Sequence, residues 1–274
     1  GRGLLATPTD VAHLPVTPDA LVDLEQAPQL VAGADLVSVM TANNEVGTVQ
    51  PLAALATIAR EVAPAAVLHT DAIAAAPWLD LAVVAPQFDL VSICAHKLGG
   101  PVGIGALCFR REVALAPLLV GGGQERGRRS GTPDVASAVG LAVALRLCVA
   151  EREAAVALTS ARRDQLCKLL TNGIDGIRAT VAGVPILPGT CHVTIDGVSS
   201  EELVFLCDEA GLCVSAASSC ASGASRRSHV LEAMGAAVDR DAATLRLSLG
   251  HDTTDDEVAR AAAVVIDAVR RLRG

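Results

Sequence analysis

Two apolar segments of strand length each end in a polar cluster, and they constrain the fold more than any other part of the chain. The first runs from Val67 to Asp71 and ends in an acid, and the second runs from Leu90 to Lys97 and ends in a basic pair. Because ligands bind at the carboxyl ends of the strands in open α/β sheets, polar residues there indicate a site. Asp71 and Lys97 lie 26 positions apart, which is typical of two parallel strands joined by a crossover.

A carboxylate and an amine at neighbouring strand ends suit pyridoxal phosphate. In such a site the amine of Lys97 forms a Schiff base with the cofactor, and the carboxylate of Asp71 keeps the pyridinium nitrogen protonated. The same two residues are also compatible with a structural salt bridge or with two unrelated surface positions. The spacing alone leaves these interpretations open.

Strand-like and helix-like segments alternate along the first half of the chain. Strands are expected at 36–40, 67–70, 88–94 and 104–109, a helix between residues 20 and 30, and another helix that Pro51 opens. This alternation predicts an α/β fold with a mostly parallel, doubly wound sheet.

The second half of the chain has a different pattern. A long helix at about 133–172 precedes strands at 191–195 and 244–249 and helices at 200–210, 226–234 and 254–272. Ser199 or Ser200 is expected to cap the first of those shorter helices. The pattern predicts a large α/β domain in residues 1–140 and a smaller α+β domain in residues 141–274.

Charge and cysteine usage exclude several classes of function. The net charge of -8 argues against nucleic-acid binding, and no apolar run is long enough to span a membrane. The eight cysteines lack paired C-x-x-C spacing, and several lie in apolar runs. They therefore predict reduced thiols in the cytoplasm and no metal site.

Two loops and one strand carry further candidate residues. The glycine- and arginine-rich loop at 121–132 could bind an anion or form an interface, or it could be a flexible surface loop. Cys220 lies among small residues at 215–225, where it could be a mobile nucleophile or a passive thiol. Arg246 interrupts an apolar strand and needs a partner, either a substrate carboxylate or a structural acid.

Six segments together resemble the cysteine desulfurases, a family of fold-type-I pyridoxal-phosphate enzymes. They occur in the family's order across nearly the whole chain. The segments are T-A-N-N-E-V-G-T-V-Q-P (41–51), H-T-D-A (69–72), A-H-K-L-G-G-P-V-G-I-G-A-L (95–107), G-G-G-Q-E-R-G-R-R-S-G-T (121–132), S-S-C-A-S-G-A-S-R-R-S-H-V-L (218–231) and L-R-L-S-L-G-H-D-T-T (245–254). The resemblance implies a fold-type-I transferase fold with a smaller α+β domain at its carboxyl end.

The resemblance also implies which residues bind the cofactor. Lys97 would be the Schiff-base lysine, and Asp71 would be the partner of the pyridinium nitrogen. His96 would contact the cofactor phosphate, and Cys94 stands where the family usually has a phosphate-binding serine. Thr132 would reach the phosphate of the neighbouring subunit's cofactor, which implies a homodimer.

For the reaction, the resemblance implies removal of sulfur from L-cysteine. Asn44 would lie beside the cofactor ring and the substrate carboxylate, and Arg246 would bind that carboxylate. Cys220 would attack the substrate sulfur, leaving L-alanine and a persulfide, with Lys97 as the proton shuttle and His96 beside it. The persulfide would supply an acceptor, such as an iron–sulfur scaffold protein or a carrier for thio-cofactor or tRNA thiolation.

Three departures from the family pattern keep other functions open. Ala74 replaces a glutamine that would bind the cofactor's phenolic oxygen, and Cys94 is a weaker donor than serine. The chain also lacks the first part of the family pattern, so we expect it to be incomplete at its amino end. The alternatives are a catalytically impaired fragment that acts only as a docking module and a relative of selenocysteine lyase.

Overall fold

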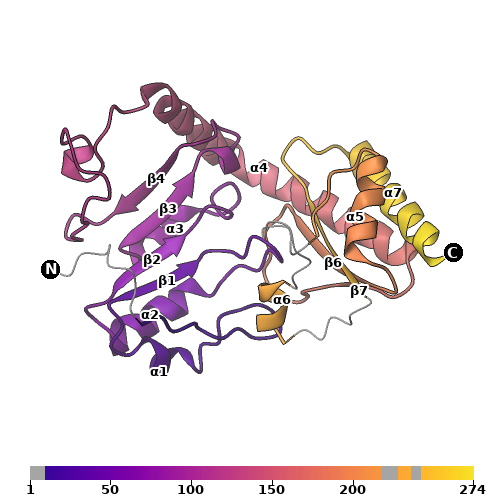
Figure 1. The fold of residues 1–274 in the computed structure, drawn as a ribbon, viewed down its shortest axis with the longest axis horizontal. Coiled ribbons are helices and arrows are strands. Elements are labelled where there is room, and N and C mark those ends of the chain that lie inside the picture. The colour runs from indigo at the N-terminus through magenta and orange to yellow at the C-terminus, as the bar shows by residue number, and fades with distance from the viewer. Residues whose placement is uncertain (1–9, 217–227, 236–241) are drawn as a thin grey trace. The chain divides into compact units, whose positions relative to one another are not determined.

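The computed structural model describes residues 10–216, 228–235 and 242–274, and the chain divides into two compact units (Figure 1). Unit 1 comprises residues 1–14, 23–41 and 51–150. Unit 2 comprises residues 15–22, 42–50 and 151–274. Two short segments from the first fifth of the chain therefore pack with its second half.

Unit 1 is built on a four-stranded sheet in the order β1-β2-β3-β4. Its strands are β1 (Leu36–Met40), β2 (Val67–Asp71), β3 (Leu90–Cys94) and β4 (Gly105–Phe109). The first three strands run parallel, as the sequence predicted, and β4 pairs with β3 in the antiparallel sense. The sheet order is visible in Figure 1.

Short helices and turns connect these strands. They are α1 (Ala27–Val31), α2 (Leu52–Val62), α3 (Leu81–Val84) and the 3-10 turns η1 (Ala85–Gln87), η2 (His96–Leu98) and η3 (Glu125–Gly127). The helix that Pro51 opens is confirmed as α2, and its inward face carries Leu52, Leu55 and Ala59.

The expected helix between residues 20 and 30 is wrong over its first part. Ala20 has a φ of 60°, and Val16 and Val22 form an antiparallel bridge, so the chain turns back there before α1 begins. The Gln50 side chain holds this turn, accepting a hydrogen bond from the Val22 amide and donating one to the Ala20 carbonyl.

The two faces of the unit 1 sheet differ in burial. Val37, Val39 and Leu68 are buried on one face, whereas alternate positions such as Leu36 and Met40 are exposed on the other. Side chains alternate along a strand, and Asp71, the last residue of β2, is in register with Met40. The side chain of Asp71 therefore lies on this second, exposed face.

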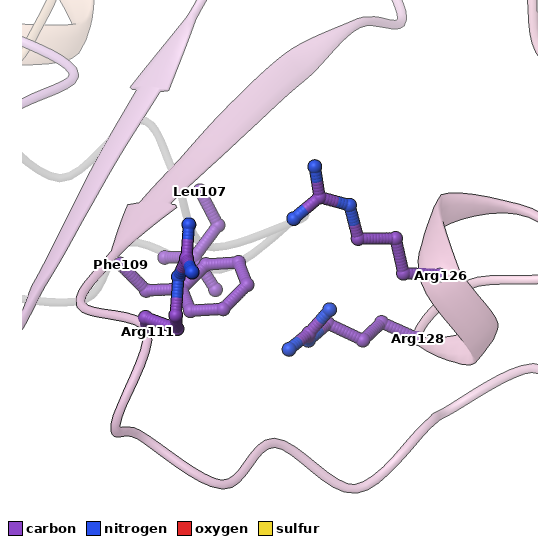
Figure 2. A pocket seen from close by; sticks show the side chains of 5 residues that line it. All are labelled: Leu107, Phe109, Arg111, Arg126 and Arg128. Carbon is purple, nitrogen blue, oxygen red and sulfur yellow. The ribbon is translucent and has the colours of Figure 1, made fainter.

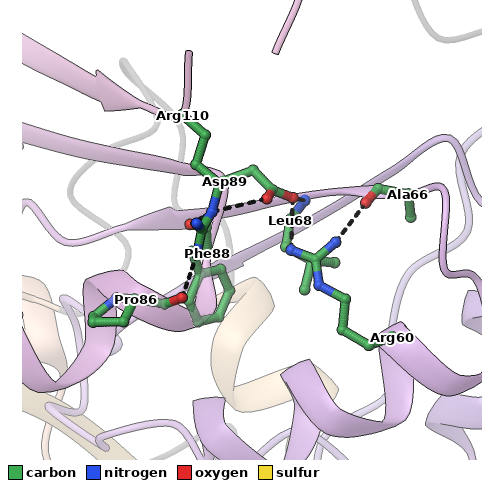
Figure 3. Close-up of polar contacts among 7 residues, drawn as sticks. All are labelled: Arg60, Ala66, Leu68, Pro86, Phe88, Asp89 and Arg110. Carbon is green, nitrogen blue, oxygen red and sulfur yellow. Dashed lines mark hydrogen bonds and ion pairs between the residues drawn. The ribbon is translucent and has the colours of Figure 1, made fainter. Parts of the chain in front are cut away.

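A partly buried carboxylate braces the amino end of β3. Asp89 accepts hydrogen bonds from the Leu68 amide and from Arg60 Nη2, each at 2.8 Å, and its other oxygen lies 3.3 Å from Arg110 Nε (Figure 3). Arg60 and Arg110 also donate to backbone carbonyls, including those of Ala66 and Phe88. The cluster joins α2, β2, β3 and the residue after β4.

Helix α4 (Val135–Gly173) begins in unit 1 and continues into unit 2, close to the long helix that the sequence predicted. Unit 2 has an antiparallel sheet in the order β5-β6-β7, formed by Ile177–Ala179, Thr190–Asp196 and Ala242–Ser248. Its other helices are α5 (Ser200–Glu209), α6 (His229–Ala233) and α7 (Asp255–Arg273).

Small aliphatic side chains form the core of unit 2. The strands β6 and β7 contribute Val193, Ile195 and Leu245, which pack with residues of α4, α5 and α7. The expected cap of α5 is partly confirmed, since Ser199 occupies the N-cap position but its side chain makes no capping bond. The hydroxyl of Ser200 instead accepts a hydrogen bond from the Thr244 amide on β7.

Candidate active site

Asp71 and Lys97 follow neighbouring parallel strands at the same edge of the unit 1 sheet. Asp71 is the last residue of β2 and is in register with Ser92 on β3, and Lys97 follows the end of β3 in η2. The carboxylate of Asp71 accepts a hydrogen bond from the Ile73 amide at 2.8 Å, which fixes its orientation. The predicted parallel pairing of the two strands is therefore confirmed.

A tight turn presents Lys97 at this edge. The amides of Leu98 and Gly100 both donate to the Ala95 carbonyl, and Gly99 ends the turn with a φ of 77°, a conformation that favours glycine. Leu98 is buried, whereas Lys97 is exposed. The turn thus anchors one side chain in the core and leaves the lysine amine accessible.

Three hydrogen-bonded polar side chains, those of Ser38, His69 and Ser92, lie on the same face of the unit 1 sheet as Asp71. His69 is bonded on one ring nitrogen to the Ser38 hydroxyl and on the other to the Ser92 hydroxyl, both at 2.8 Å. Burial lowers the pKa of His69, and the nearby charge of Asp71 offsets part of that effect. The neutral ring therefore links β1, β2 and β3. No role for His69 was predicted, although Ser38, which is in register with it on β1, was a signal for it.

The residues expected near the phosphate also lie in unit 1. Cys94 is buried at the end of β3, with its sulfur 3.7 Å from His96 Nε2, and His96 itself is exposed. Thr132 is exposed at the end of the glycine- and arginine-rich loop.

The same loop forms one side of an open pocket of about 320 Å³. Arg126 and Arg128 line it together with Arg111, Leu107 and Phe109, and the guanidinium of Arg128 lies 4.9 Å from the centre of the Phe109 ring (Figure 2). Three positive side chains thus converge beside the edge strand β4.

Asn44 and Arg246 come together in unit 2. Arg246 Nη1 donates a 2.8 Å hydrogen bond to the backbone carbonyl of Asn44, and the Asn44 side chain is exposed. Arg246 Nε is buried and has no hydrogen-bond partner among the described residues. A guanidinium donor is thus available for an acceptor that the described chain does not supply.

The turn that carries Asn44 is held by the side chain of the preceding residue, Asn43. The Asn43 side chain accepts hydrogen bonds from the amides of Glu45 and Val46 at 2.8 and 2.9 Å. Gly47 has a φ of 83°, and a Cβ at this position would lie 2.8 Å from the Cβ of Thr190. Both the backbone conformation and the contact with β6 require glycine here.

Two buried titratable groups that the sequence did not single out lie in this part of unit 2. Glu45 accepts a hydrogen bond from the Ser228 hydroxyl, and burial raises the pKa of the Glu45 carboxyl. His192 on β6 is in register with Arg246 on β7, and burial, together with the charge of Arg246, lowers the pKa of His192 to about 4. A neutral imidazole therefore faces the arginine.

Cys220 lies outside the described residues, but residues on both sides of its segment are placed. Ser215 exchanges two backbone hydrogen bonds with Arg246, at 2.8 and 3.1 Å. Ser228 bonds to Glu45, which directly follows Asn44. The described residues Ser215 and Ser228 therefore contact Arg246 and the Asn44 turn, respectively.

Neither a metal cluster nor a membrane span is found in the described part of the chain. Within residues 10–216, 228–235 and 242–274, no three His, Cys, Asp or Glu side chains are grouped so as to hold a metal ion. No helix over the same ranges is long and apolar enough to cross a membrane.

Comparisons with known proteins identify the family. The sequence pattern of the class-V aminotransferases matches residues 5–261. The IscS-like cysteine desulfurase of Mycobacterium tuberculosis is 42% identical over 267 residues, which cover 96% of this chain and 67% of the relative. The chain belongs to the cysteine desulfurases. Enzymes of this family depend on pyridoxal phosphate.

Solved structures agree with this desulfurase assignment. A NifS-like protein matches with a TM-score of 0.86 and 33% identity, over 96% of this chain and 68% of that one. SspA in complex with cysteine matches with a TM-score of 0.72 and 30% identity, over 90% and 68% of the two chains. The predicted family and fold class are confirmed. The chain spans about two thirds of the length of the relatives it matches.

The described residues fit the family's cofactor at one edge of the unit 1 sheet. The accessible amine of Lys97 and the oriented carboxylate of Asp71 are the two groups that the ring end of pyridoxal phosphate requires. Cys94 and His96 adjoin the lysine and are the nearest candidates for the phosphate, although Cys94 is a weaker donor than serine. The missing glutamine at Ala74 reduces the hydrogen bonds available to the ring.

Proposed function

We propose that this chain carries the reaction centre of a cysteine desulfurase, which takes sulfur from L-cysteine and leaves L-alanine and a persulfide on Cys220. The observation that carries the proposal is the placement of Asp71 and Lys97 at the ends of adjacent parallel strands. We further propose that unit 1 is the cofactor-binding domain and unit 2 the small domain.

Each residue of unit 1 has a distinct task in this proposal. Bound pyridoxal phosphate supplies an electron sink for the substrate carbon that bears the amine. Lys97 attaches the cofactor and moves a proton at its Nζ atom. Asp71 holds the ring nitrogen in its protonated form, and His96, Cys94 and Thr132 bind the phosphate.

Unit 2 supplies the groups for the substrate. Arg246 binds the carboxylate of L-cysteine, because its buried Nε is a donor without a partner and a guanidinium forms paired hydrogen bonds to a carboxylate. Asn44 lies beside Arg246 and offers its exposed side chain to the same group. The Cys220 thiolate forms a bond to the substrate sulfur as the carbon–sulfur bond breaks, so the sulfur remains as a persulfide.

The remaining parts of the proposal concern partners and location. Thr132 lies on an exposed loop, which supports a homodimer in which it reaches the partner's cofactor. The persulfide needs a thiol acceptor, for which we propose an iron–sulfur scaffold protein. We also propose that the protein acts in the cytoplasm, since the cysteines of the described residues are reduced thiols outside any disulfide.

The test uses the full chain reconstituted with pyridoxal phosphate. We expect an absorbance band at the border of the visible and ultraviolet ranges, which Lys97→Ala abolishes, and cysteine-dependent sulfide release in the presence of a reductant. Cys220→Ala should keep the band and lose sulfide release, whereas Cys213→Ala, at an exposed cysteine of the same unit, should keep both.

The outcomes separate the proposal from its alternatives. If the wild-type chain shows neither the band nor sulfide release, the desulfurase proposal is wrong and the docking-module function is supported. A much faster reaction with selenocysteine than with cysteine would instead assign the chain to the selenocysteine lyases.

A further inference from the structure

Two thiols in unit 2 form a close pair outside the proposed reaction centre. Cys167 on α4 and Cys191 on β6 approach with 2.8 Å between their Sγ atoms. They are 24 positions apart, and no short cysteine motif in the sequence links them. The proposed desulfurase reaction uses neither of them.

The two thiols have different surroundings. Cys191 is 1% exposed and belongs to the core of unit 2, whereas Cys167 is partly exposed at the edge of that core. Arg163 lies one helical turn before Cys167 on α4 and forms an ion pair with the neighbouring Asp164 at 2.7 Å. Cys167 is therefore the more accessible of the two thiols.

The shared proton of the pair favours Cys167 as the nucleophile. The hydrogen bond from Cys191 lowers the pKa of the Cys167 thiol against the effect of burial, and the charges of Arg163 and Asp164 act on it in opposite directions. The same bond and burial raise the pKa of the Cys191 thiol. The accessible sulfur is thus the one that more readily becomes a thiolate, which is the reactive form.

We propose that Cys167 and Cys191 are a redox site, which low-molecular-weight disulfides such as oxidised glutathione convert to an intramolecular disulfide between α4 and β6. A disulfide bond is about 2.0 Å long, so the two sulfurs need to approach by only about 0.8 Å. This inference does not depend on the proposed desulfurase activity.

The reaction is a double thiol–disulfide exchange. The Cys167 thiolate attacks one sulfur of the reagent, forms a mixed disulfide and releases one thiolate of the reagent. The Cys191 sulfur then attacks the Cys167 sulfur and releases the second reagent thiolate. The two cysteine protons end on the two released thiols, and the two electrons lost by the cysteines reduce the reagent disulfide.

The bond would tie a helix to the central strand of the unit 2 sheet. Cys191 precedes His192, which is in register with Arg246. Because the bond would close a loop of intermediate length in the unfolded chain, we expect oxidation to raise the Tm by about 5 °C or more.

The experiment treats the full chain with oxidised glutathione, blocks the remaining thiols under denaturing conditions and measures the intact mass and the peptide map. We expect two fewer blocking groups than on the reduced chain blocked in the same way, one peptide linked through Cys167 and Cys191, and reversal by a reductant. Cys191→Ser should instead trap glutathione on Cys167, and Cys167→Ser should prevent both products. Cys207→Ser, at a buried cysteine of the same core, should behave like wild type.

Two results would overturn the proposal. One is the recovery of both Cys167 and Cys191 as blocked thiols from the treated wild-type chain. The other is a disulfide that joins Cys167 to a different cysteine, such as Cys220. Both results come from the wild-type protein, so a variant that fails to fold does not affect the decision.

Discussion

Acidification should destabilise this protein through one buried histidine on β6. His192 is 5% exposed, and its Nδ1 atom lies 2.6 Å from the Thr180 hydroxyl. Its Nε2 atom has no hydrogen-bond partner among the described residues, and Arg246 is its neighbour across the strand pair. Burial, and next the charge of Arg246, lower the pKa of His192 from 6.5 to about 4.

The direction of the effect follows from proton binding by the folded and unfolded chains. The unfolded chain takes up a proton at this histidine as the pH falls below about 6.5, whereas the folded chain stays neutral there until the pH approaches about 4. Stability is therefore lost between these two pH values and is not lost further below them. Between pH 7 and pH 5 this histidine alone should lower the free energy of unfolding by about 2 kcal/mol.

Urea denaturation at pH 7 and pH 5 measures this effect in wild type and in His192→Gln. Glutamine does not titrate and can still bond to Thr180, so wild type should lose about 2 kcal/mol more than the variant on acidification. Other titrating groups contribute equally to both proteins and cancel. Equal losses in wild type and His192→Gln would refute the reasoning.

Two stability predictions concern other buried contacts. Asp89→Ala should lower the free energy of unfolding by about 2–3 kcal/mol, because it leaves the Leu68 amide and two arginines without their acceptor. Urea denaturation measures this loss, and a value below about 0.5 kcal/mol would contradict the role given to Asp89. Gly47→Ala should cost more than Gly33→Ala, since both glycines have positive φ but only the added Cβ at position 47 meets Thr190. The same denaturation series tests this comparison, and equal losses would show that the contact with Thr190 is relieved without cost.

Local sequence patterns were sufficient for most elements. The strands β1, β2 and β3 were predicted because their apolar residues and the breaks after them depend only on neighbouring positions. The six motifs also predicted the family, which the comparisons confirm. The failure at residues 20–30 has a tertiary cause, since Gln50 holds Ala20 and Val22 in a turn where local propensity favours a helix.

Contacts between distant positions were decided only by the tertiary structure. The sequence singled out Asn44 and Arg246 separately, and the fold joined them through the Asn44 backbone carbonyl, a group that residue identity does not reveal. The Cys167–Cys191 pair likewise depends on how α4 packs against β6. Sequence by itself determined the family and the polar ends of the strands, because those features are local. Which side chains meet was set by strand register and helix packing, which arise only when the whole chain folds.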